Sequence, residues 1–363
     1  MKILITGGAG FVGSYLATCL QQDYPEAKIF AFDNLHRRGS EINLSLLKEK
    51  KITFLHGDIR IKEDLLDLEE GPFDLLIEAS AEPSVLAGVQ GSPHYCLQTN
   101  LMGTINCLEL MRKHQGRVIF LSTSRVYSIN SLREIPLKET KTRLTFNDEK
   151  ATSLMGIGRE GITEKFSVED HRSLYGTSKF CSEKIIEEYV HQYNLKAIIN
   201  RLGVIAGPGQ WGKSDQGVFT FWMVRHFFGG NLSYNGFGGK GLQVRDLLHP
   251  KDLYELIKLQ IDHLFSLNDN SSHVGLYNAG GGESCSTSLL ELTGICQEIT
   301  QKKLSITSKP ETNIVDIPYY ITDNTKVKNA YPSWKVRYDV PELMKEIHHW
   351  ISSNSEKVRP IFY

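Results

Sequence analysis

Short apolar runs alternate with longer stretches of helical periodicity through the N-terminal half of the chain. The runs are rich in β-branched residues and only a few residues long, which is typical of buried strands. Between them the apolar positions recur at helical spacing, as in residues 12–22 and 99–114. Strands that alternate with helices in this way predict a parallel sheet with crossover helices. The predicted strands are residues 2–6, 28–33, 52–57, 74–80, 117–122 and 196–202.

Two stretches interrupt this alternation. Residues 126–174 are polar and charged and contain three glycines, so they look too irregular for a sheet element but long enough for a lid or an interface insertion. From residue 203 onward, glycine-rich and aromatic pieces such as "GPGQWGKSDQGVFTFW" replace the alternation and predict a substrate-binding lobe. Helical periodicity returns at residues 288–300 and in "EIHHWI" near the C-terminus, where we predict an amphipathic helix.

The pattern therefore predicts an α/β fold, a doubly wound parallel sheet with a smaller C-terminal substrate-binding lobe. The sheet domain would cover residues 1–202, with an insertion at about 128–172 and a returning strand and helix at about 244–280. Residues 203–363 would mainly form the substrate-binding lobe. Two domains fit a chain of 363 residues because one hydrophobic core serves roughly 150 residues.

Charge and cysteine usage narrow the class of protein. The chain has 41 basic and 42 acidic side chains, so it lacks the field that nucleic acid would require, and we expect no nucleic-acid partner. No stretch approaches the roughly 18 apolar residues of a membrane span, so we expect no membrane and a cytoplasmic protein. The run "GVFTFWMVRHFF" predicts a buried or interface helix rather than a membrane-surface helix. The six cysteines include no C-x-x-C pair, and we expect no metal site.

The first chemical signal is a glycine turn between the first predicted strand and the first predicted helix. Gly7, Gly10 and Gly13 form a G-x-x-G-x-x-G pattern there. Glycines allow a tight turn and a close approach of the backbone to a pyrophosphate, whose charge the helix N-terminus stabilises. The pattern in this context predicts a dinucleotide site.

The second predicted strand ends in Asp33, 20 residues beyond Gly13. A carboxylate there can accept both ribose hydroxyls of an adenosine, which favours NAD over NADP, although Arg37 and Arg38 nearby argue the other way. Asp58 follows the third strand and is placed to meet the adenine, with Ile59 packing against the adenine face. The other positions at which we expect cofactor contacts are Phe11, Val12, Asn34, Ala79, Ser80 and Ala81.

The second chemical signal is the stretch "RSLYGTSKF", which places Tyr175 and Lys179 four positions apart. On a helix both side chains can therefore face one ligand. A tyrosine that acts as a base near neutral pH needs its anion favoured by about 4 kcal/mol, or about three pKa units. An ammonium about 4 Å away at an effective dielectric of about 20 supplies an energy of that size, so we expect Lys179 to activate Tyr175. Thr123 would orient the substrate hydroxyl for proton loss.

These residues together resemble one family. "TGGAGFVGS", Asp33, "GDI", "STSRVY" and "YGTSK" are similar to the motifs of extended short-chain dehydrogenases/reductases, over essentially the whole chain. "AEPSV", "KSDQGVFTFW" and "QVRDLLHPKDL" are most similar to the CDP-paratose (CDP-tyvelose) 2-epimerase group. The resemblance implies a Rossmann domain that binds NAD, the catalytic residues Thr123, Tyr175 and Lys179, and a phosphate-binding role for Arg245. The positions expected to contact the substrate are Ser84, Thr123, Ser124, Arg125, Gln216, Phe237 and Arg245.

The implied reaction is redox-neutral epimerisation of a nucleotide sugar, with a CDP-sugar favoured, through transient oxidation to a keto sugar and return of the hydride. The alternatives are a nucleotide-sugar 4-epimerase, a net reductase or dehydratase, and a non-catalytic NAD-binding regulator. Dehydration is disfavoured because Ser124 and Arg125 stand where sugar dehydratases carry an acidic pair. The resemblance further implies a homodimer.

Two departures from the family pattern bear on the substrate. Asn313 occupies a place where relatives commonly carry a phosphate-binding arginine. Thr123 and Tyr175 are 52 positions apart, more than compact members need. The extra residues either wall the sugar site or form a surface loop.

Overall fold

The protein divides into two compact units in a computed structural model that describes residues 1–89, 91–147, 154–212, 216–268 and 272–362. Each unit is assembled from three separate stretches of chain. The first unit comprises residues 1–126, 174–201 and 254–277. The second unit comprises residues 127–173, 202–253 and 278–363.

A seven-stranded sheet forms the centre of the first unit. β1 pairs in parallel with β2 and with β4, β2 with β3, and β4 with β5, so the strand order reverses at β1. All six strands predicted from the sequence lie in this sheet, and the doubly wound fold is confirmed. The strands, from one edge to the other, are β12 (His273–Ala279), β8 (Lys196–Leu202), β5 (Arg117–Thr123), β4 (Leu75–Glu78), β1 (Lys2–Thr6), β2 (Lys28–Asp33) and β3 (Thr53–His56).

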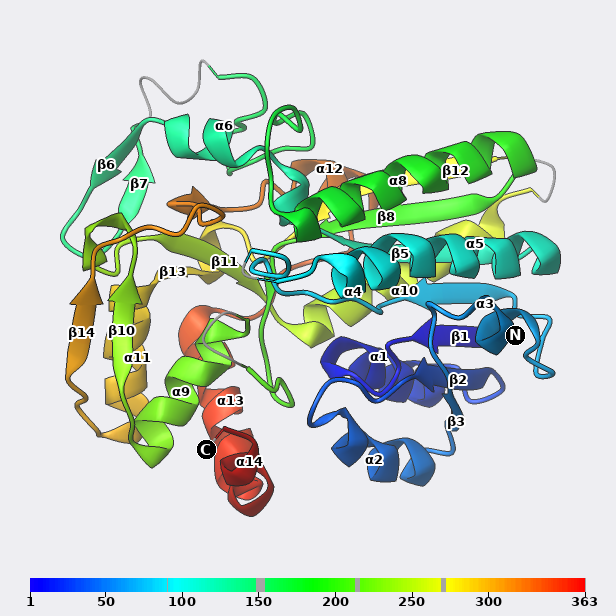
Figure 1. Ribbon diagram of the computed structural model, residues 1–363, viewed down its shortest axis with the longest axis horizontal. Helices are drawn as coiled ribbons and strands as arrows, with labels where there is room; N and C mark the ends of the chain where they lie inside the picture. The colour runs from blue at the N-terminus through cyan, green and yellow to red at the C-terminus, as the bar shows by residue number, and fades with distance from the viewer. Residues whose placement is uncertain (90, 148–153, 213–215, 269–271, 363) are drawn as a thin grey trace. The chain divides into compact units, whose positions relative to one another are not determined.

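Helices cover this sheet because its central strands are apolar on both faces. Within β1, Ile3, Leu4 and Ile5 are all fully buried, and successive side chains point to opposite faces of the sheet. α5 and α8 lie side by side along the sheet (Figure 1) and share a core cluster with residues of β1, β2, β4 and β5. The helices of this unit are α1 (Phe11–Asp23), α2 (Asn43–Glu49), α3 (Lys62–Leu66), α4 (His94–Leu97), α5 (Gly103–His114), α8 (Leu174–Tyr193) and α10 (Pro250–Ser266).

The second unit contains smaller sheets. β11 pairs with β13 on one side and with β15 on the other, and it also pairs with β9; β10 and β14 form a separate parallel pair. Its strands are β6 (Leu137–Glu139), β7 (Leu144–Phe146), β9 (Val204–Ile205), β10 (Leu232–Asn235), β11 (Val244–Leu248), β13 (Ser286–Ser288), β14 (Ile306–Lys309) and β15 (Tyr319–Tyr320). Its helices are α6 (Ile129–Glu134), α9 (Val218–Phe228), α11 (Leu289–Thr300), α12 (Thr325–Ala330), α13 (Val340–Ser353) and α14 (Ser355–Phe362).

The polar stretch after β5 is more ordered than its composition suggests. It contains α6, which Ser128 caps by accepting a hydrogen bond from the Ser131 amide, and the antiparallel pair β6–β7. Leu137, Leu144 and Phe146 of this pair pack against the cluster around Tyr319. The expectation that residues 126–174 hold no sheet element was therefore wrong, because contacts with distant residues supply the apolar partners that the stretch lacks locally.

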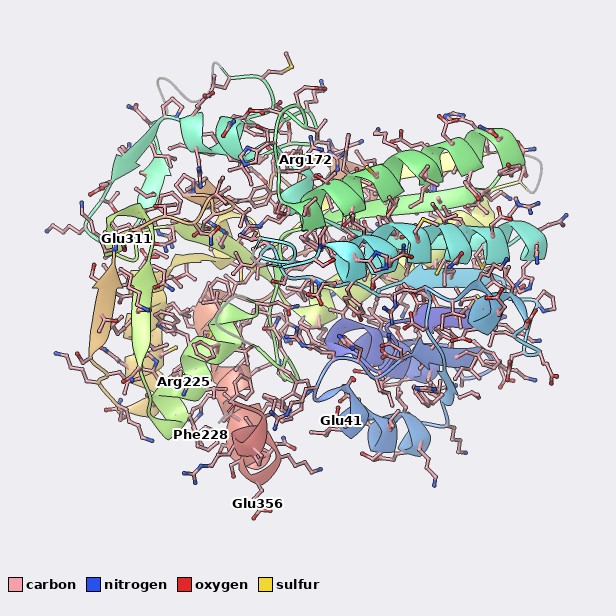
Figure 2. All side chains as sticks on the ribbon, in the orientation of Figure 1. Glu41, Arg172, Arg225, Phe228, Glu311 and Glu356 are labelled. Atoms are coloured by element: carbon pink, nitrogen blue, oxygen red, sulfur yellow. The ribbon has the colours of Figure 1, made fainter. Side chains whose placement is uncertain are left out.

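The predicted C-terminal helices are confirmed, and their ends are set by local sequence. α11 and α13 both begin with a capping box, Ser288 with Glu291 and Asp339 with Glu342. The apolar run of α9 buries Phe219 and Trp222 and packs against both helices, as expected of a buried helix. Arg225 and Phe228 lie towards the end of α9 (Figure 2). Among the described residues, no helix has the length and apolarity needed to span a membrane.

Candidate functional site

The glycine turn lies between β1 and α1, as predicted. Gly7 has a left-handed backbone with φ of 65°, and its carbonyl accepts a hydrogen bond from the Gly10 amide at 3.0 Å. A Cβ on Gly13 would lie 2.1 Å from the Gly7 carbonyl oxygen, so no side chain fits there. No side chain caps the N-terminus of α1, which leaves its positive end available to an anion.

Asp33 ends β2 beside this turn. Its carboxylate accepts hydrogen bonds from the Ala9 amide at 3.1 Å and the Leu35 amide at 2.8 Å. Burial raises the pKa of Asp33, and these backbone donors oppose the rise. The end of β4 lies against the turn as well, since a Cβ on Gly7 would meet the Ala79 carbonyl oxygen at 2.8 Å and the Ser80 nitrogen at 2.9 Å. Three strand ends thus gather around one turn, which suits a dinucleotide.

Asp58 lies after β3 but already has partners. Arg60 donates to it through Nε and Nη2, with Nη2 at 2.6 Å from Oδ2, and Asn34 donates at 2.9 Å. Burial raises the pKa of Asp58, yet the hydrogen bonds from Arg60 and Asn34 bring it down to about 2. Arg60 and His36 both lie against the ring of Tyr95, each 4.6 Å from its centroid. Sequence reasoning missed both Arg60 and Tyr95. Tyr95 comes from α4, which only the fold brings to this position.

The remaining predicted cofactor positions are local to the same elements. Phe11 and Val12 begin α1 and are half-buried, and Ala81 is half-buried in the loop after β4. Ile59 is buried and packs closely against Gly103 at the start of α5.

Tyr175 and Lys179 lie on the first two turns of α8, and Thr123 ends β5. The Arg125 amide donates to the Thr123 hydroxyl oxygen at 3.2 Å, which leaves the Thr123 proton free for Tyr175. Burial raises the pKa of Tyr175, whereas the hydrogen bond with Thr123 and the positive charge of Arg125 lower it. The three predicted catalytic residues are therefore in one unit, with Thr123 and Tyr175 in hydrogen-bond contact.

The electrostatics differ from the expectation in one respect. The cation that acts most strongly on the Tyr175 phenol is Arg125, and the ammonium of Lys179 instead lies 3.8 Å from the centroid of the Phe120 ring. Burial lowers the pKa of Lys179 to about 8, and the charge of Glu78 is the largest opposing influence. Arg125 is thus a second cation that bears on the phenol, and activation of Tyr175 by Lys179 stays a prediction.

Asn100 is a residue that sequence reasoning missed. It lies in a π-helical turn, η2 (Gln98–Met102), between α4 and α5. Its side chain donates to the Ser178 hydroxyl at 3.1 Å and to the Glu82 carbonyl at 3.0 Å, and accepts from the Glu82 amide at 2.8 Å. Asn100 thereby ties the loop after β4 to the helix that carries Tyr175. π-helical turns are frequent at functional sites. One extra residue in a helix does not show in the spacing of apolar positions, so the sequence did not reveal this turn.

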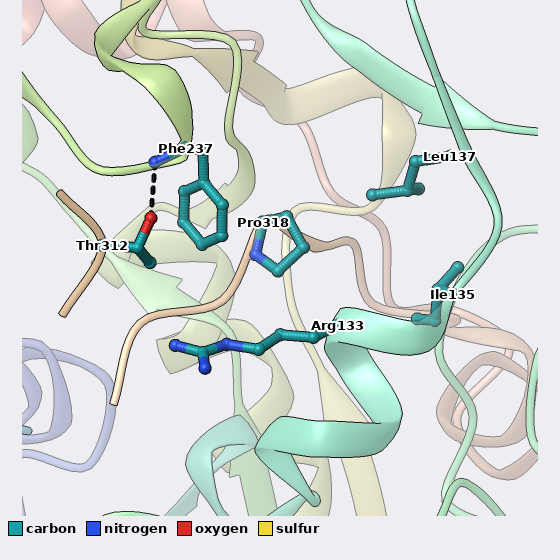
Figure 3. Close-up of a pocket in the computed structure, with 6 residues that line it drawn as sticks. All are labelled: Arg133, Ile135, Leu137, Phe237, Thr312 and Pro318. Atoms are coloured by element: carbon teal, nitrogen blue, oxygen red, sulfur yellow. Dashed lines mark hydrogen bonds between the residues drawn. The ribbon is translucent and has the colours of Figure 1, made fainter. Parts of the chain in front are cut away.

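The second unit contains a pocket of about 460 Å³ lined by Phe237 and five other residues (Figure 3). The Phe237 backbone is left-handed, with φ of 47°, and its amide donates to the Thr312 hydroxyl at 2.7 Å. The Arg133 side chain extends from α6 past Pro318 in the same pocket (Figure 3). The six lining residues are Arg133, Ile135, Leu137, Phe237, Thr312 and Pro318.

Two arginines donate hydrogen bonds to the loop of residues 313–317, which leads to Pro318 in the pocket wall. Arg245 donates to the Asp316 carboxylate at 3.1 Å and to the Ile317 carbonyl at 2.5 Å. Arg133 donates to the carbonyl of Asp316 at 3.0 Å and to that of Asn313 at 2.8 Å. The pocket cation Arg133 was missed because it lies 180 positions before Asn313 in sequence.

The other predicted substrate residues are divided between the units. Ser84, Ser124 and Arg125 belong to the first unit, where Ser84 accepts from the Leu86 amide at 3.2 Å. Gln216 belongs to the second unit, is half-buried and precedes α9. Within the described ranges, no three His, Cys, Asp or Glu side chains gather in a way that would hold a metal ion.

Comparison with known proteins identifies the family of this chain. The model of the "NAD dependent epimerase/dehydratase family" matches residues 3–280. CDP-paratose 2-epimerase of Salmonella typhi is 29% identical over 97% of this chain and 100% of its own length. A putative UDP-glucose 4-epimerase of Methanocaldococcus jannaschii is 27% identical over 97% of this chain and 99% of its own.

Solved structures show the same fold. UDP-glucose 4-epimerase of Thermus thermophilus, in complex with NAD, superposes with a TM-score of 0.76 at 24% identity, over 96% of this chain and 99% of that one. The family model covers most of the chain, and its match includes the glycine turn, Asp33, Thr123, Tyr175 and Lys179. The chain is thus an enzyme of the NAD dependent epimerase/dehydratase family.

Proposed function

We propose that this enzyme epimerises a nucleotide sugar, with a CDP-sugar as substrate and C2 of the sugar as the inverted centre. The observation that carries the proposal is that Thr123, in hydrogen-bond contact with Tyr175, ends β5 at the same edge of the parallel sheet at which the glycine turn follows β1. The choice of a CDP-sugar is supported by the similarity to CDP-paratose 2-epimerase along nearly the whole chain. We assign the chemical step to the first unit and nucleotide binding to the second.

The residues of the first unit fit NAD. The uncapped N-terminus of α1 suits the pyrophosphate, and Asp33 presents a carboxylate for the adenosine ribose. Bound there, NAD would supply the hydride chemistry of the reaction, oxidation of the sugar carbon and return of the hydride to the other face of the ketone. Because the hydride is returned, the enzyme consumes no cofactor.

The chain itself moves the proton. Tyr175 would take the proton of the sugar hydroxyl, and Thr123 would hold the same hydroxyl in line by a hydrogen bond. Arg125 and Lys179 would both favour the phenolate, Arg125 by direct action on the phenol and Lys179 together with the bound pyridinium. Return of the proton from Tyr175 completes the cycle, so the phenol is restored at each turnover.

We further propose that the pocket of the second unit binds the nucleotide, with Arg133 as its phosphate-binding cation. Arg133 reaches the Asn313 carbonyl from α6, so its charge lies where the family resemblance places an arginine at position 313. Phe237 supplies an aromatic face for the base. The stretch between Thr123 and Tyr175 would thereby contribute to substrate binding rather than form a plain surface loop.

Replacing Arg133 with methionine should weaken CDP binding by about 10–100-fold, because a charge-assisted hydrogen bond is lost while the apolar stem remains. Isothermal titration with CDP would measure the dissociation constant. Lys138→Met, an exposed charge on β6, is the matched control and should leave the constant unchanged. Equal affinity of Arg133→Met and the parent enzyme would rule out this role for Arg133.

Substituting Gly13 with alanine should weaken NAD binding and lower the fraction of purified enzyme that carries NAD. The new Cβ would lie 2.1 Å from the Gly7 carbonyl oxygen, so the turn must move, at a cost of about 1–3 kcal/mol or about 5–150-fold in NAD affinity. NAD released by heat from the purified protein gives the occupancy. Gly294→Ala, in open space within α11, is the control, and it should retain full occupancy and gain about 0.5–1 kcal/mol of stability.

The proposed reaction is tested by incubating the NAD-loaded enzyme with CDP-paratose and with UDP- and GDP-sugars and following the products by NMR. Inversion at one carbon without a lasting change in nicotinamide absorbance is expected. A 4-keto-6-deoxy product would establish a dehydratase, and stoichiometric NADH would establish a net dehydrogenase. Inversion of UDP-glucose alone would redirect the proposal to a 4-epimerase, in keeping with the Methanocaldococcus relative.

A homodimer is part of the same proposal. Met102, Leu174 and Tyr193 are apolar side chains that stay exposed on η2 and α8, with 40%, 37% and 50% of their surface accessible. Sedimentation velocity should give twice the mass of one chain. A single species at the mass of one chain would refute this part alone.

A further inference from the structure

A cluster of four charged side chains is buried beneath the helix of Tyr175. Lys179 and Glu183 lie one turn apart on α8, Arg201 lies on β8 and Glu78 ends β4. None of these four residues is more than 3% exposed as a whole. Charges removed from water this fully must be compensated by one another, so the pairing within the cluster decides the charge of Lys179.

Glu183 already has its counter-ion. Arg201 donates to both carboxylate oxygens of Glu183. Its Nη2 lies 2.7 Å from Oε2, and its Nε lies 3.1 Å from both Oε1 and Oε2. The Ser122 hydroxyl donates to Oε1 of Glu183 at 2.5 Å. Three donors satisfy Glu183, and the positive charge of Arg201 offsets the field of Glu183 at Lys179.

Glu78 is the other carboxylate of the cluster. It lies opposite Phe120 in the register of β4 and β5, and the Lys179 ammonium lies over that same Phe120 ring. One Glu78 oxygen is 2.6 Å from the Thr104 hydroxyl. The second oxygen and the Lys179 Nζ are both buried without a hydrogen-bond partner among the described residues. The unpaired carboxylate oxygen and the unpaired ammonium thus belong to residues that both neighbour Phe120, Glu78 across the strand pair and Lys179 over the ring.

Thr104 makes the charge of Glu78 adjustable. Its hydroxyl lies 2.6 Å from Glu78 Oε1 and 2.8 Å from the Asn100 carbonyl, yet it has only one proton. If Glu78 is ionised, Thr104 donates to Glu78; if Glu78 is protonated, Glu78 donates to Thr104, which turns to Asn100. The Ser182 hydroxyl also donates to the Asn100 carbonyl, so neither state leaves that carbonyl unpaired.

We propose that Glu78 is a positioning residue that acts through Lys179, as the buried counter-ion that keeps this lysine protonated during turnover. The inference rests on the proposed function, since it concerns the lysine of the proposed catalytic set. It needs no contact between Glu78 and the substrate. A consequence is that the charge of Glu78, which does not touch the substrate, helps to set the pH range in which the enzyme works.

The sign of the effect follows from the groups that face Lys179. These are the carboxylates of Glu78 on β4 and Glu183 on α8, which raise the pKa of Lys179 against the larger lowering by burial, and the thiols of Cys96 and Cys107. Burial raises the pKa of both thiols, so they stay neutral near pH 7. Removing the Glu78 charge therefore lowers the pKa of Lys179 and lets its proton leave at lower pH.

The test uses Glu78→Gln in the NAD-loaded enzyme, because glutamine keeps the shape and the Thr104 contact but removes the charge. The alkaline limb of the kcat/KM profile should move to lower pH by about one to two units, the size of shift that an opposite charge within about 4–6 Å produces. Glu78→Asp retains the charge and should shift the limb less. Glu109→Gln, which alters a partly exposed carboxylate paired with Arg112, is the matched control and should not shift it.

A second measurement does not depend on activity. The ¹³Cε shift of Lys179 in lysine-labelled enzyme, assigned by its loss in Lys179→Arg, gives the titration midpoint directly. A midpoint that is lower in Glu78→Gln but unchanged in Glu109→Gln supports the counter-ion role. The same midpoint in Glu78→Gln and the parent enzyme overturns it, whatever the activity. A lowered midpoint with an unmoved pH–rate profile overturns the catalytic consequence, and absence of epimerisation of any nucleotide sugar would count against the proposed function alone.

Discussion

Replacing Tyr175 with phenylalanine should lower kcat for epimerisation by about 10²–10⁴-fold, the usual contribution of a positioned acid–base group. The substitution removes only the phenolic oxygen, which is the atom that Thr123 binds and that Arg125 acts on. The ring remains to fill its place on α8, so NAD content and circular dichroism should match those of the parent enzyme. Initial rates with saturating nucleotide sugar, followed by NMR, provide the measurement.

The matched control is Tyr193→Phe on the same helix. Tyr193 is 50% exposed at the end of α8, and loss of its hydroxyl should leave kcat within the error of the assay. A Tyr175→Phe enzyme with full activity would remove Tyr175 from the mechanism.

Replacing Arg201 with methionine should destabilise the first unit by about 3–5 kcal/mol, because it leaves Glu183 buried and uncompensated. Glu183 is fully buried and the Arg201 side chain is 4% exposed, so water cannot take over the lost hydrogen bonds. Urea unfolding followed by fluorescence and by circular dichroism would measure the loss. Coincidence of the two probes is the check that one free energy of unfolding describes the transition.

Two companion variants sharpen this test. Lys184→Met breaks the exposed pair between Lys184 and Glu187, also on α8, and should cost no more than about 1 kcal/mol. Glu183→Leu combined with Arg201→Met should recover part of the loss, since no lone charge stays buried. If Arg201→Met is as mild as Lys184→Met, the buried pair does not stabilise the unit.

The parts of the fold that the sequence predicted are those whose signal is local. β1, β2 and β8 have the predicted bounds because each is a short β-branched run that ends at a turn or a polar residue. The turn at Gly7 could be placed because glycines, strand and helix are adjacent in the chain. Asp33 follows from the same logic, since the end of β2 must lie beside the end of β1 in a parallel sheet.

The parts that could not be predicted depend on contacts between distant residues. Arg133 meets the loop of Asn313 only once α6 has packed, and nothing near Arg133 in sequence signals a pocket. The action of Arg125 on the Tyr175 phenol depends on the packing of residues 124–126 against α8, which the local sequence does not signal. In the sequence, Glu78 is one more residue of the fourth predicted strand. Its proposed role as a counter-ion follows only from the structure, in which its Oε2 and the Lys179 Nζ are both buried without a hydrogen-bond partner among the described residues.

The order in which the chain visits the two units constrains how the protein can be made. β8 and β12 join the sheet of the first unit only after the chain has crossed into the second unit and back. During synthesis, a nascent chain that ends near residue 200 would present an open sheet edge, which is a template for aggregation. The Rossmann half should therefore complete folding only after α10 and β12 emerge from the ribosome, and C-terminal truncations before residue 277 should yield insoluble protein.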